Sequence, residues 1–558
     1  MGFKAPPKAR EPLRVAGRLA YFIDTWKVLT GDPWVLDAIV GYQIPFKAEP
    51  SQVPRPPEGM FSKEQAALLR EEVKSLLQKS AISPQRESIG GFYSTLFLVP
   101  KMGEQMRPVI NLKCVNQWVE APHFKMEGIA TLQDLLRVGD WMVKVDLKDA
   151  YFTIPLHPHH QQFLRFTVDR HCYQFTCLPF GLSCAPWIFT KVMKPLMTLL
   201  RGWGIRIIIY IDDMLLLVES RDTAMQHLEV LLFLLETLRF VVKKEKSYLH
   251  PAQELEFLGL MVDSKSFRLK LPSKKMVQIR KEAGQLQRKE SVSARQLSQF
   301  LGKLNAASQA LLVVPLFYRA LQGDLQRALL KGNQDYDQSL VLSREAQEEL
   351  SWWQSHLTQW NGKTVMQRQA QIVIQSDASL AGWGAACNGV TTGGSWTPQE
   401  QSMHINCLEL LAAELAVKTF LKAQRGVAVL LQLDNSTAVA YINNLGGTVL
   451  SALTSLAKSL WLWALERDIM VTAQHIQGVS NTAADKQSRL EKDRSDWMLA
   501  HEVFQQSSPG TSGGGSLCLS TDPPAATILQ LEARPFGRSS GCIPAGLSRD
   551  MPILHGAL

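Results

Sequence analysis

The sequence lacks an apolar run long enough to cross a bilayer. Such a span takes about 20 consecutive residues, and the longest candidates in this chain are interrupted by Asp, Glu or Pro. The first residues, MGFKAPPKAREPLR, are basic but are followed by no apolar core, so they do not have the pattern of a secretory signal. We therefore expect no membrane among the partners of this protein.

Cysteine is also scarce. Eight cysteines in 558 residues do not indicate a disulfide framework, which is typical of short secreted domains. Cys172, Cys177 and Cys184 lie close together, but their spacing fits no common zinc pattern and no histidine follows at ligand spacing. We expect reduced thiols, several of them in the core.

The remaining composition is ordinary for a globular protein of several domains. The chain is 46% hydrophobic and 20% charged, and its length exceeds that of a single hydrophobic core. A formal net charge of +9 favours a polyanionic partner, although a dispersed excess of Lys and Arg is often only a solvated surface. No internal repeat is evident.

Helical and strand-like segments mix without a regular βαβ alternation, which favours an α+β fold. The segment 61–80 has helical spacing with a serine at the expected N-cap, and 272–360 is mainly helical. Strands are expected at 92–99, 109–112, 143–146 and 372–375, a helix at 132–137 and a hairpin at 205–218. The expected regions are a preface and Pro-rich connector (1–60), an α+β unit (61–268), a helical unit (269–367), a second α/β unit (368–495) and a low-complexity tail (496–558).

Residues 207–218, IIIYIDDMLLLV, place two adjacent aspartates between apolar runs. A hairpin would put Tyr210 and Ile211 at the end of one strand and Asp212 and Asp213 at its tip. An ordinary turn explains such a pair equally well. Asp146 also ends an apolar strand, and carboxylates that converge from separate strands suit a site for two Mg²⁺ ions.

The surrounding motifs make the interpretation specific. VDLKDAYFTIPL, LPFGLSCAPWIF, YIDDMLLL and FLGL follow one another in the order of four reverse transcriptase palm motifs, and PKMGEQMRPVINLKCVN resembles the fingers segment of these enzymes. The resemblance covers about residues 90–265 and implies a right-hand polymerase with a helical thumb and connection. It makes Asp146, Asp212 and Asp213 the metal-binding triad, with Asp213 the less certain ligand.

The same resemblance implies a set of substrate-binding residues. Lys101 and Arg107 would clamp the incoming triphosphate, and Lys246 would lie near the leaving pyrophosphate. Tyr151 would stand beneath the sugar and exclude a 2′-hydroxyl. The other implied contacts are Phe180 and Gly181 against the nascent base pair and Leu258–Gly259 in a primer-gripping hairpin.

Two positions depart from the usual pattern of the family. Asn111 stands where many relatives have Asp, and Phe180 replaces the Gln of retroviral enzymes. Without the family resemblance, Tyr151 and Phe180 could also be plain core aromatics.

A second acidic set lies downstream: Asp377, Glu409, Asp434 and Asp485. Glu409 falls beside a helical stripe of Leu408, Leu411, Ala412 and Leu415, from which it could point toward Asp377. Each acid alone could be a helix cap or a solvated residue, and Asn481 could cap the helix that contains Asp485.

DASLAGWGAA, INCLELLAAE, LDNSTAVAYIN and HIQGVSNTAADKQSR resemble the four acidic motifs of a ribonuclease H domain. The resemblance implies two Mg²⁺ ions, with Mn²⁺ a possible substitute, and cleavage of the RNA strand of a hybrid. His475 precedes the last of these acids, and we interpret it as structural because a lone histidine is weak evidence. The implied partners are an RNA template, a DNA primer, an RNA–DNA hybrid and deoxynucleoside triphosphates.

Finer features resemble tyrosine-recombinase retrotransposons of the DIRS type, among them HFKMEGIATLQDLL, RGWGIRIIIYIDD, LSWWQSHLTQWNGK and HINCLEL. No Asp-Thr/Ser-Gly protease motif, zinc-binding integrase head or recombinase segment is visible. Read one frame over, the tail can encode LCASQLTRQLPQFYSWRPDPL, so we expect a frameshift after about residue 507. The alternatives are an inactive nucleic-acid-binding remnant, a co-opted retroelement protein, or an active nuclease whose polymerase is dead, as the atypical Asn111 suggests.

Overall fold

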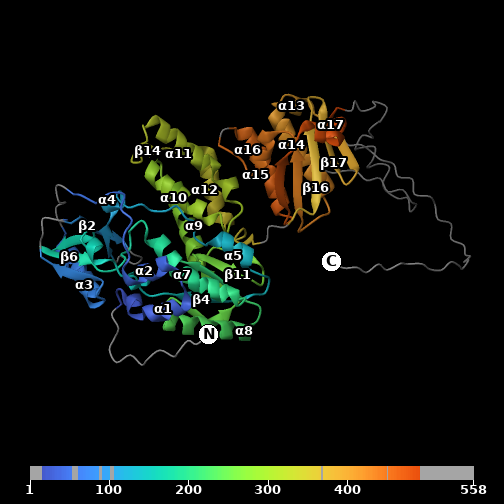
Figure 1. The fold of residues 1–558 in the computed structure, drawn as a ribbon. Coiled ribbons are helices and arrows are strands. Elements are labelled where there is room, and N and C mark those ends of the chain that lie inside the picture. The colour runs from blue at the N-terminus through green and yellow to red at the C-terminus, as the bar shows by residue number, and fades with distance from the viewer. Residues whose placement is uncertain are drawn as a thin grey trace, which may run out of the picture. The chain divides into compact units, whose positions relative to one another are not determined.

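The computed structural model describes residues 15–52, 59, 61–86, 91–100, 106–365, 369–448 and 450–489. The expected frameshifted tail lies outside these residues. The chain divides into two compact units, one within residues 1–367 and one within 368–558, and each is considered by itself (Figure 1). The expected α+β class is confirmed, since helices and sheets are present in both units. Within the described ranges, no helix is long and apolar enough to cross a membrane.

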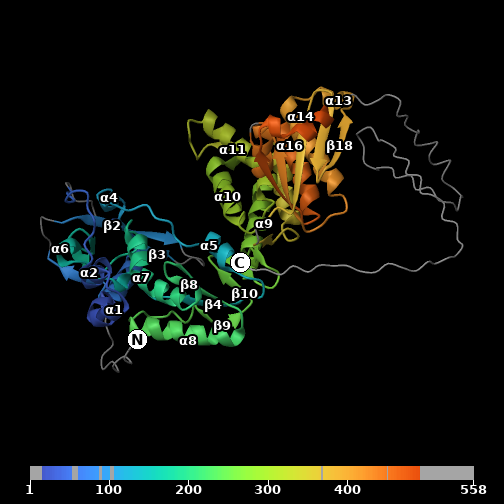
Figure 2. The ribbon, with the colours of Figure 1, turned by 45° about the vertical axis from the view of Figure 1, so that its right-hand side comes forward.

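The first unit is centred on a four-stranded antiparallel sheet. Its strands, in spatial order, are β7 (Arg206–Tyr210), β8 (Asp213–Val218), β4 (Trp141–Asp146) and β9 (Tyr248–Ala252). The isoleucines and leucines of β7 and β8 are buried, because helices pack against this sheet. These helices are α7 (Ala185–Gly202) and α8 (Arg221–Thr237), and Figure 2 shows α8 running alongside β4 and β9.

A second sheet of this unit has the order β1-β6-β5-β2-β3. Its strands are β1 (Ile82–Gln85), β2 (Tyr93–Pro100), β3 (Met106–Asn111), β5 (Arg165–Val168) and β6 (His171–Phe175). Helix α3 (Lys63–Gln78) contacts β1 and β3 and begins at the expected cap, where Ser62 and Gln65 form a capping box. The short elements here are α4 (Lys113–Asn116), α5 (Ile129–Leu135), η2 (Ala150–Thr153) and α6 (Pro158–Gln161).

The N-terminal preface belongs to the core of the first unit. It forms η1 (Arg18–Phe22), α1 (Ile23–Leu29) and α2 (Pro33–Gly41). Trp26 is fully buried and makes an edge contact with Phe240, while Trp34 makes an edge contact with Trp187 of α7. We call residues 15–50 the strap, because backbone hydrogen bonds join it to the end of α3, to η2 and to the segments that follow α4 and η2.

The helical region is confirmed, although it is interrupted by short strands. Its helices are α9 (Ser273–Gln287), α10 (Ala294–Ala307), α11 (Arg319–Lys331) and α12 (Arg344–His356), with η3 (Val314–Phe317) between them. Two more strands, β13 (Val292–Ser293) and β14 (Ser339–Leu340), pair within it. A four-stranded sheet joins the two ends of this region. Its strands are β10 (Glu254–Phe257), β11 (Leu260–Asp263) and β12 (Arg268–Lys270), which precede the helices, and β15 (Lys363–Thr364), which follows them.

The second unit is one five-stranded sheet covered by helices. Its order is β18 (Val390–Ser395), β17 (Gly382–Cys387), β16 (Ile372–Ala378), β19 (Ala428–Leu433) and β20 (Met470–His475). Strands β16, β19 and β20 are parallel, so their carboxyl ends meet at one edge. The helices are α13 (Pro398–Gln401), α14 (Ile405–Phe420), α15 (Ser436–Asn443), α16 (Ser451–Leu465) and α17 (Thr482–Ser488), with η4 (Gly478–Ser480) before the last.

Several expected boundaries shift. Strand β3 begins at Met106 rather than Val109, and α5 ends at Leu135 rather than Arg137. Helix α14 is buried on more than one face rather than along the single expected stripe. Leu411 and Leu415 of that stripe are only partly buried, whereas Ala413 outside it is fully buried. The six cysteines of the described residues are free, as expected, and four of them are buried.

Candidate functional sites

The acidic pair of the first unit lies where β7 turns into β8. The turn consists of Ile211 and Asp212, and Ile211 has a φ of 57°, which is uncommon for a β-branched residue. Asp213 is already the first residue of β8 and pairs with Tyr210. The expectation that both aspartates occupy the tip is therefore wrong for Asp213, because the turn takes only two residues.

Asp146 lies directly opposite Asp213, since β4 and β8 are antiparallel with these two residues in register. The backbone N–H of Leu147 donates to the carbonyl of Asp212 at 2.9 Å, which fixes the turn beside the end of β4. Three carboxylates from three chain positions thus share one edge of the sheet. Asp146 is only 5% exposed.

Burial dominates the electrostatics of this edge. It raises the pKa of Asp146 and of Asp212, and the charge of Asp213 raises both further. Asp213 forms an ion pair with Lys144, whose Nζ lies 3.1 Å from its Oδ1. Three carboxylates with one compensating lysine are a donor set that fits hard divalent cations.

The segment after α8 adds a basic residue and a hydroxyl to this edge. The N–H of Lys243 donates to the carbonyl of Asp146 at 2.7 Å, and the N–H of Asp146 donates to the hydroxyl of Ser247 at 3.0 Å. The charge of Lys246 acts on Asp146 and Asp212 and offsets part of the rise in pKa that burial causes in both. The structure thus brings Lys246 near the carboxylates, and it adds Ser247, which the sequence interpretation missed.

An aromatic wall stands next to the carboxylates. Tyr151 is buried, its ring centroid lies 4.9 Å from that of Phe180, and Phe189 lies on its other side at 5.7 Å. Burial and the charge of Asp212 raise the pKa of Tyr151, so its hydroxyl stays protonated. Phe180 is 38% exposed, so it offers an apolar surface to a ligand as well as packing on Tyr151.

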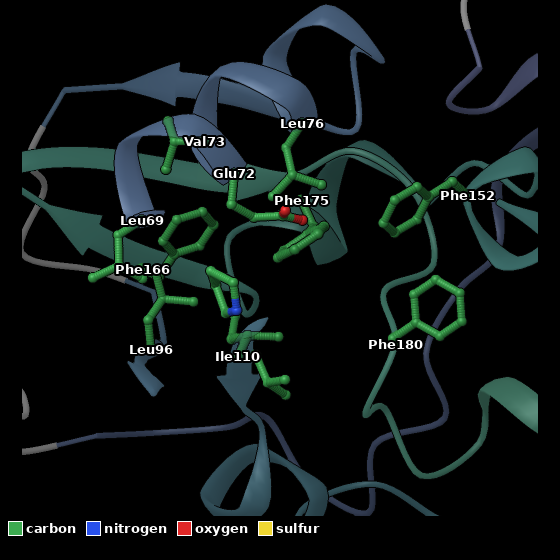
Figure 3. A pocket seen from close by; sticks show the side chains of 12 residues that line it. Leu69, Glu72, Val73, Leu76, Leu96, Ile110, Phe152, Phe166, Phe175 and Phe180 are labelled. Atoms are coloured by element: carbon green, nitrogen blue, oxygen red, sulfur yellow. The ribbon is translucent and has the colours of Figure 1, made fainter. Parts of the chain in front are cut away.

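A cavity of about 90 Å³ lies between α3 and the second sheet, and Phe180 is one of its lining residues (Figure 3). Its walls are mostly aromatic and aliphatic, with Phe152, Phe166 and Phe175 among them, and Glu72 is the only acid among the described residues that line it. Phe180 therefore rests on a loosely filled apolar layer.

The backbone around Phe180 is held by a side chain that the sequence interpretation missed. Asn116 donates from Nδ2 to the carbonyl of Gly181 at 2.9 Å and accepts from the N–H of Ser183 at 2.9 Å. Gly181 has a φ of 92°, which disfavours any side chain there. The unusual Asn111 uses its side chain locally and accepts from the N–H of Lys113.

Four other predicted residues differ in what the structure says of them. Lys101 lies outside the described residues. Arg107 lies in β3, in register with Val99. Leu258 and Gly259 form the two-residue loop between β10 and β11, with φ values of 48° and 76°, so the expected hairpin is present while its contact with a primer stays a prediction.

In the second unit, three of the four predicted acids converge. Asp377 lies in β16, Asp434 follows β19, and Glu409 lies in α14. One oxygen from each lies within 4.8 Å of the other two, and among the described residues they are the only trio of acids, His or Cys to do so. Glu409 therefore points over the sheet edge as expected.

The chemistry of this trio fits a divalent cation. Asp377 and Glu409 are 4% and 6% exposed, and Oε2 of Glu409 is buried without a hydrogen-bond partner among the described residues. Burial, together with the charges of Asp377 and Asp434, raises the pKa of Glu409 to about 8. A buried carboxylate oxygen without a donor is costly unless a cation compensates it.

The fourth acid, Asp485, lies in α17, and its charge acts on Asp377 of the trio. Burial raises the pKa of Asp377, the charges of Asp434 and Asp485 raise it further, and Asp485 forms an ion pair with Arg489 at 2.7 Å. The hydroxyl of Ser488 donates to Oδ2 of Asp377 at 2.6 Å. A Cβ on Gly384 would overlap the backbone of Ser488, so the glycine lets the helix lie directly on β17.

The predicted cap of α17 is only partly correct. Asn481 is the N-cap residue, but its side chain makes no capping hydrogen bond. Instead its Nδ2 donates to the carbonyl of Ser376 at 2.9 Å, and Asn481 is fully buried. It therefore ties α17 to β16, since the helix packs on the sheet too closely to leave the side chain outside.

His475 is the last residue of β20 and is exposed. Its register partner is Leu433, the residue directly before Asp434. The structure thus places the histidine at the same edge of the sheet as the acidic trio.

The raised pKa of Glu409 predicts a pH-dependent stability. Because the pKa rises from 4.5 to about 8 on folding, the folded protein binds more protons than the unfolded chain between these values. In the presence of a chelator, the free energy of unfolding should therefore fall as the pH rises through this window. Calorimetry at several pH values should show this slope, and Glu409→Gln should remove most of it. Equal slopes in the two proteins would contradict the assignment.

Comparison with known proteins gives one family match. Residues 99–262 match the family described as reverse transcriptase (RNA-dependent DNA polymerase). This segment contains the three carboxylates of the first unit, Tyr151, Phe180 and Lys246. Part of the first unit is therefore similar to a reverse transcriptase domain.

Curated relatives are viral polyproteins. The enzymatic polyprotein of figwort mosaic virus (strain DxS) is 24% identical over 454 residues, which cover 78% of this chain and 64% of the relative. That of carnation etched ring virus is 25% identical over 430 residues, 74% of this chain and 61% of the relative. The Gag-Pol polyprotein of walleye dermal sarcoma virus is 29% identical over 211 residues, 37% of this chain and 12% of the relative. The chain spans less than two thirds of the length of each.

Among solved structures, the foamy viral protease-reverse transcriptase in complex with an RNA/DNA hybrid is similar. It is 16% identical with a TM-score of 0.49, and the match covers 94% of this chain and 70% of that chain. The same protein in complex with dsDNA is 17% identical with a TM-score of 0.49, covering 84% and 99%.

Proposed function

We propose that this chain is an RNA-directed DNA polymerase with ribonuclease H activity. The observation that carries the proposal is the register of β4 and β8, which sets Asp146 opposite Asp213 beside the Asp212 turn. This carboxylate edge lies within the segment that matches the reverse transcriptase family. The right-hand arrangement of fingers, palm and thumb is part of the proposal.

Asp146 and Asp212, with Asp213 as the weaker ligand, would hold the divalent ions of the polymerase. When bound, two such ions stabilise the charge of an attacking and a leaving oxygen. Lys246 would bind the pyrophosphate side of the triphosphate, since its charge already acts on Asp146 and Asp212. Arg107 and Lys101 are proposed to bind the phosphates as well. Phe180 and Gly181 would contact the base pair.

The nuclease site would be built from Asp377, Glu409, Asp434 and Asp485. The trio within 4.8 Å would hold the metal, and Asp485 would complete the set from α17. Two features support metal binding at this site. Oε2 of Glu409 is buried without a hydrogen-bond partner among the described residues, and Ser488 orients Asp377 through a hydrogen bond. The proposed substrate is the RNA strand of an RNA–DNA hybrid.

The source of the chain is proposed to be a retrotransposon of the DIRS type. The features that support it are the sequence motifs HFKMEGIATLQDLL, RGWGIRIIIYIDD, LSWWQSHLTQWNGK and HINCLEL. The intact palm and nuclease carboxylates favour an enzyme over an inactive binding remnant.

The direct test is primer extension by purified protein. With Mg²⁺ or Mn²⁺ and all four deoxynucleoside triphosphates, a DNA primer on an RNA template should be extended. A folded protein that binds the primer–template but extends it with neither ion would contradict the proposal and favour the remnant.

We expect the ring of Tyr151 to set the preference for deoxyribonucleotides over ribonucleotides. Replacing its ring by Tyr151→Val should open space beside the sugar and raise incorporation of ribonucleotides relative to deoxyribonucleotides by about 10- to 200-fold. Tyr151→Phe keeps the ring and should keep the discrimination. Single-nucleotide incorporation kinetics measure the ratio, and an unchanged ratio in Tyr151→Val would remove Tyr151 from this role.

We expect the metal affinity of the nuclease site to depend on the hydroxyl of Ser488. Because its hydroxyl orients Asp377, Ser488→Ala should weaken metal binding by about 10- to 100-fold. Ser488→Thr retains the hydroxyl and should bind nearly as the wild type. Titration calorimetry with Mn²⁺, in an Asp212→Asn background that isolates the nuclease, measures this. Equal affinity in Ser488→Ala would show that the hydrogen bond has no positioning role.

A further inference from the structure

Two arginines meet where the strap crosses the end of α8. Arg18 opens η1 and is only 9% exposed. Arg239 follows the end of α8, and its guanidinium lies 4.2 Å from the centre of the Phe22 ring, at the other end of η1. The contact of Trp26 with Phe240 holds the next turn of the strap against the same segment. Arg239 therefore packs on the short helix that Arg18 opens, although the two arginines come from separate pieces of the chain, and the charge of Arg239 acts on Arg18.

The backbone at Arg239 is in a conformation that favours glycine. Its φ is 69°, in the left-handed region, which costs a residue with a side chain roughly 1 kcal/mol or more. Glycine is the usual residue at this position after a helix. An arginine held here against that cost indicates that its side chain is useful at this place.

Among the residues that the structure describes, no acid compensates either arginine. Within the described residues, neither side chain has an ion pair or a hydrogen bond, and the Nε of each is buried without a partner. Burial lowers the pKa of Arg18, and the charge of Arg239 lowers it further. Two acids of neighbouring segments are already engaged, Asp149 with Lys79 at 2.9 Å and Asp24 with Lys27 at 3.5 Å.

We propose that Arg18 and Arg239 form a binding site for a small phosphate-bearing anion. The guanidinium group is planar, weakly hydrated and matched to phosphate oxygens, so an anion between the two would bond to both and offset their repulsion. Such a ligand would link the strap to the segment after α8. That segment continues to Lys243, whose N–H donates to the carbonyl of Asp146. The proposal does not depend on either proposed catalytic activity.

The test uses inorganic phosphate as the probe and the full chain as the protein. Thermal unfolding is followed as phosphate is added at constant ionic strength, with chloride as the balancing ion and a chelator present. An anion that binds only the folded protein raises the melting temperature progressively above its dissociation constant. The wild type should show such a rise with phosphate and none with chloride.

Arg239→Gly is the decisive variant, because glycine suits a φ of 69° and the protein should fold at least as stably without phosphate. Its phosphate-dependent rise should be lost. Arg18→Lys keeps the charge but not the planar fork, and it should weaken the apparent affinity for phosphate by at least about tenfold. Arg221→Gln, at an exposed arginine in the first turn of α8, is the matched control and should respond as the wild type.

Two results would overturn the proposal. One is a wild type that phosphate stabilises no more than chloride does. The other is an equal phosphate-dependent rise in Arg239→Gly and the wild type, which would place the phosphate at another basic surface. Because no step uses nucleic acid or a nucleotide, a failure here leaves the proposed polymerase and nuclease activities unaffected.

Discussion

Asp212→Asn should abolish primer extension while leaving hybrid cleavage unchanged. The substitution keeps the size of the side chain at the β7–β8 turn but removes a negative oxygen from the carboxylate edge. A metal ion contributes several kcal/mol of charge stabilisation to such reactions, and each 1.36 kcal/mol is tenfold in rate. We therefore expect the extension rate to fall by about a thousandfold or more.

The measurement is single-turnover extension of a labelled DNA primer on an RNA template. Asp222→Asn, in the first turn of α8, is the matched control, because Asp222 is exposed. Its rate should equal that of the wild type. Retention of more than a small fraction of the extension rate by Asp212→Asn would exclude this residue as a metal ligand. A parallel loss of hybrid cleavage would instead indicate misfolding.

Asp434→Asn should have the converse effect. Asp434 follows β19 and contributes one of the three oxygens that lie within 4.8 Å of one another. Loss of its charge should lower hybrid cleavage by about a thousandfold or more, for the same electrostatic reason. Primer extension should be unaffected, because Asp434 lies in the second compact unit and the palm carboxylates lie in the first.

Cleavage is measured with an end-labelled RNA strand annealed to DNA, in the absence of nucleotides. Glu466→Gln, in the same unit but with a largely exposed side chain, is the control and should cleave as the wild type. Equal loss of extension and cleavage in Asp434→Asn would contradict two separate sites. Normal cleavage would remove Asp434 from the nuclease.

The sequence locates the aspartates at strand ends because these strands have clear apolar patterns, whereas Glu409 and Asp485 lie in helices. β16, β19 and the β7–β8 hairpin are short apolar runs, so their ends, and the aspartates there, are readily located. It does not predict which atoms meet. The placement of Asp213 within β8 depends on a two-residue turn, and its ion pair with Lys144 depends on the register of β4.

The supporting residues were the least predictable part of the site. Ser488, Asn481 and Asn116 each hydrogen bond to a residue more than 60 positions away in the chain. Their local sequence carries no sign of this, and Asn481 in fact suggests an ordinary cap. Local pattern cannot reveal a contact that only the packing of α17 on the sheet creates.

The strap shows the same limit on a larger scale. Its apolar residues predict that it packs somewhere, but not on α7 and the segment after α8. Arg18 and Arg239 are more than 200 residues apart, so nothing in the sequence suggests that their charges meet.

One time course tests the central claim most directly. Wild-type protein, Mg²⁺ and four deoxynucleoside triphosphates are added to a DNA primer on an RNA template, with both strands labelled. We predict that the primer is extended and that the RNA is then shortened within the hybrid so formed, while Asp212→Asn shows neither extension nor this new shortening and still cleaves a preformed hybrid. A folded wild-type protein that binds the substrate but leaves both strands at their original length would contradict the account.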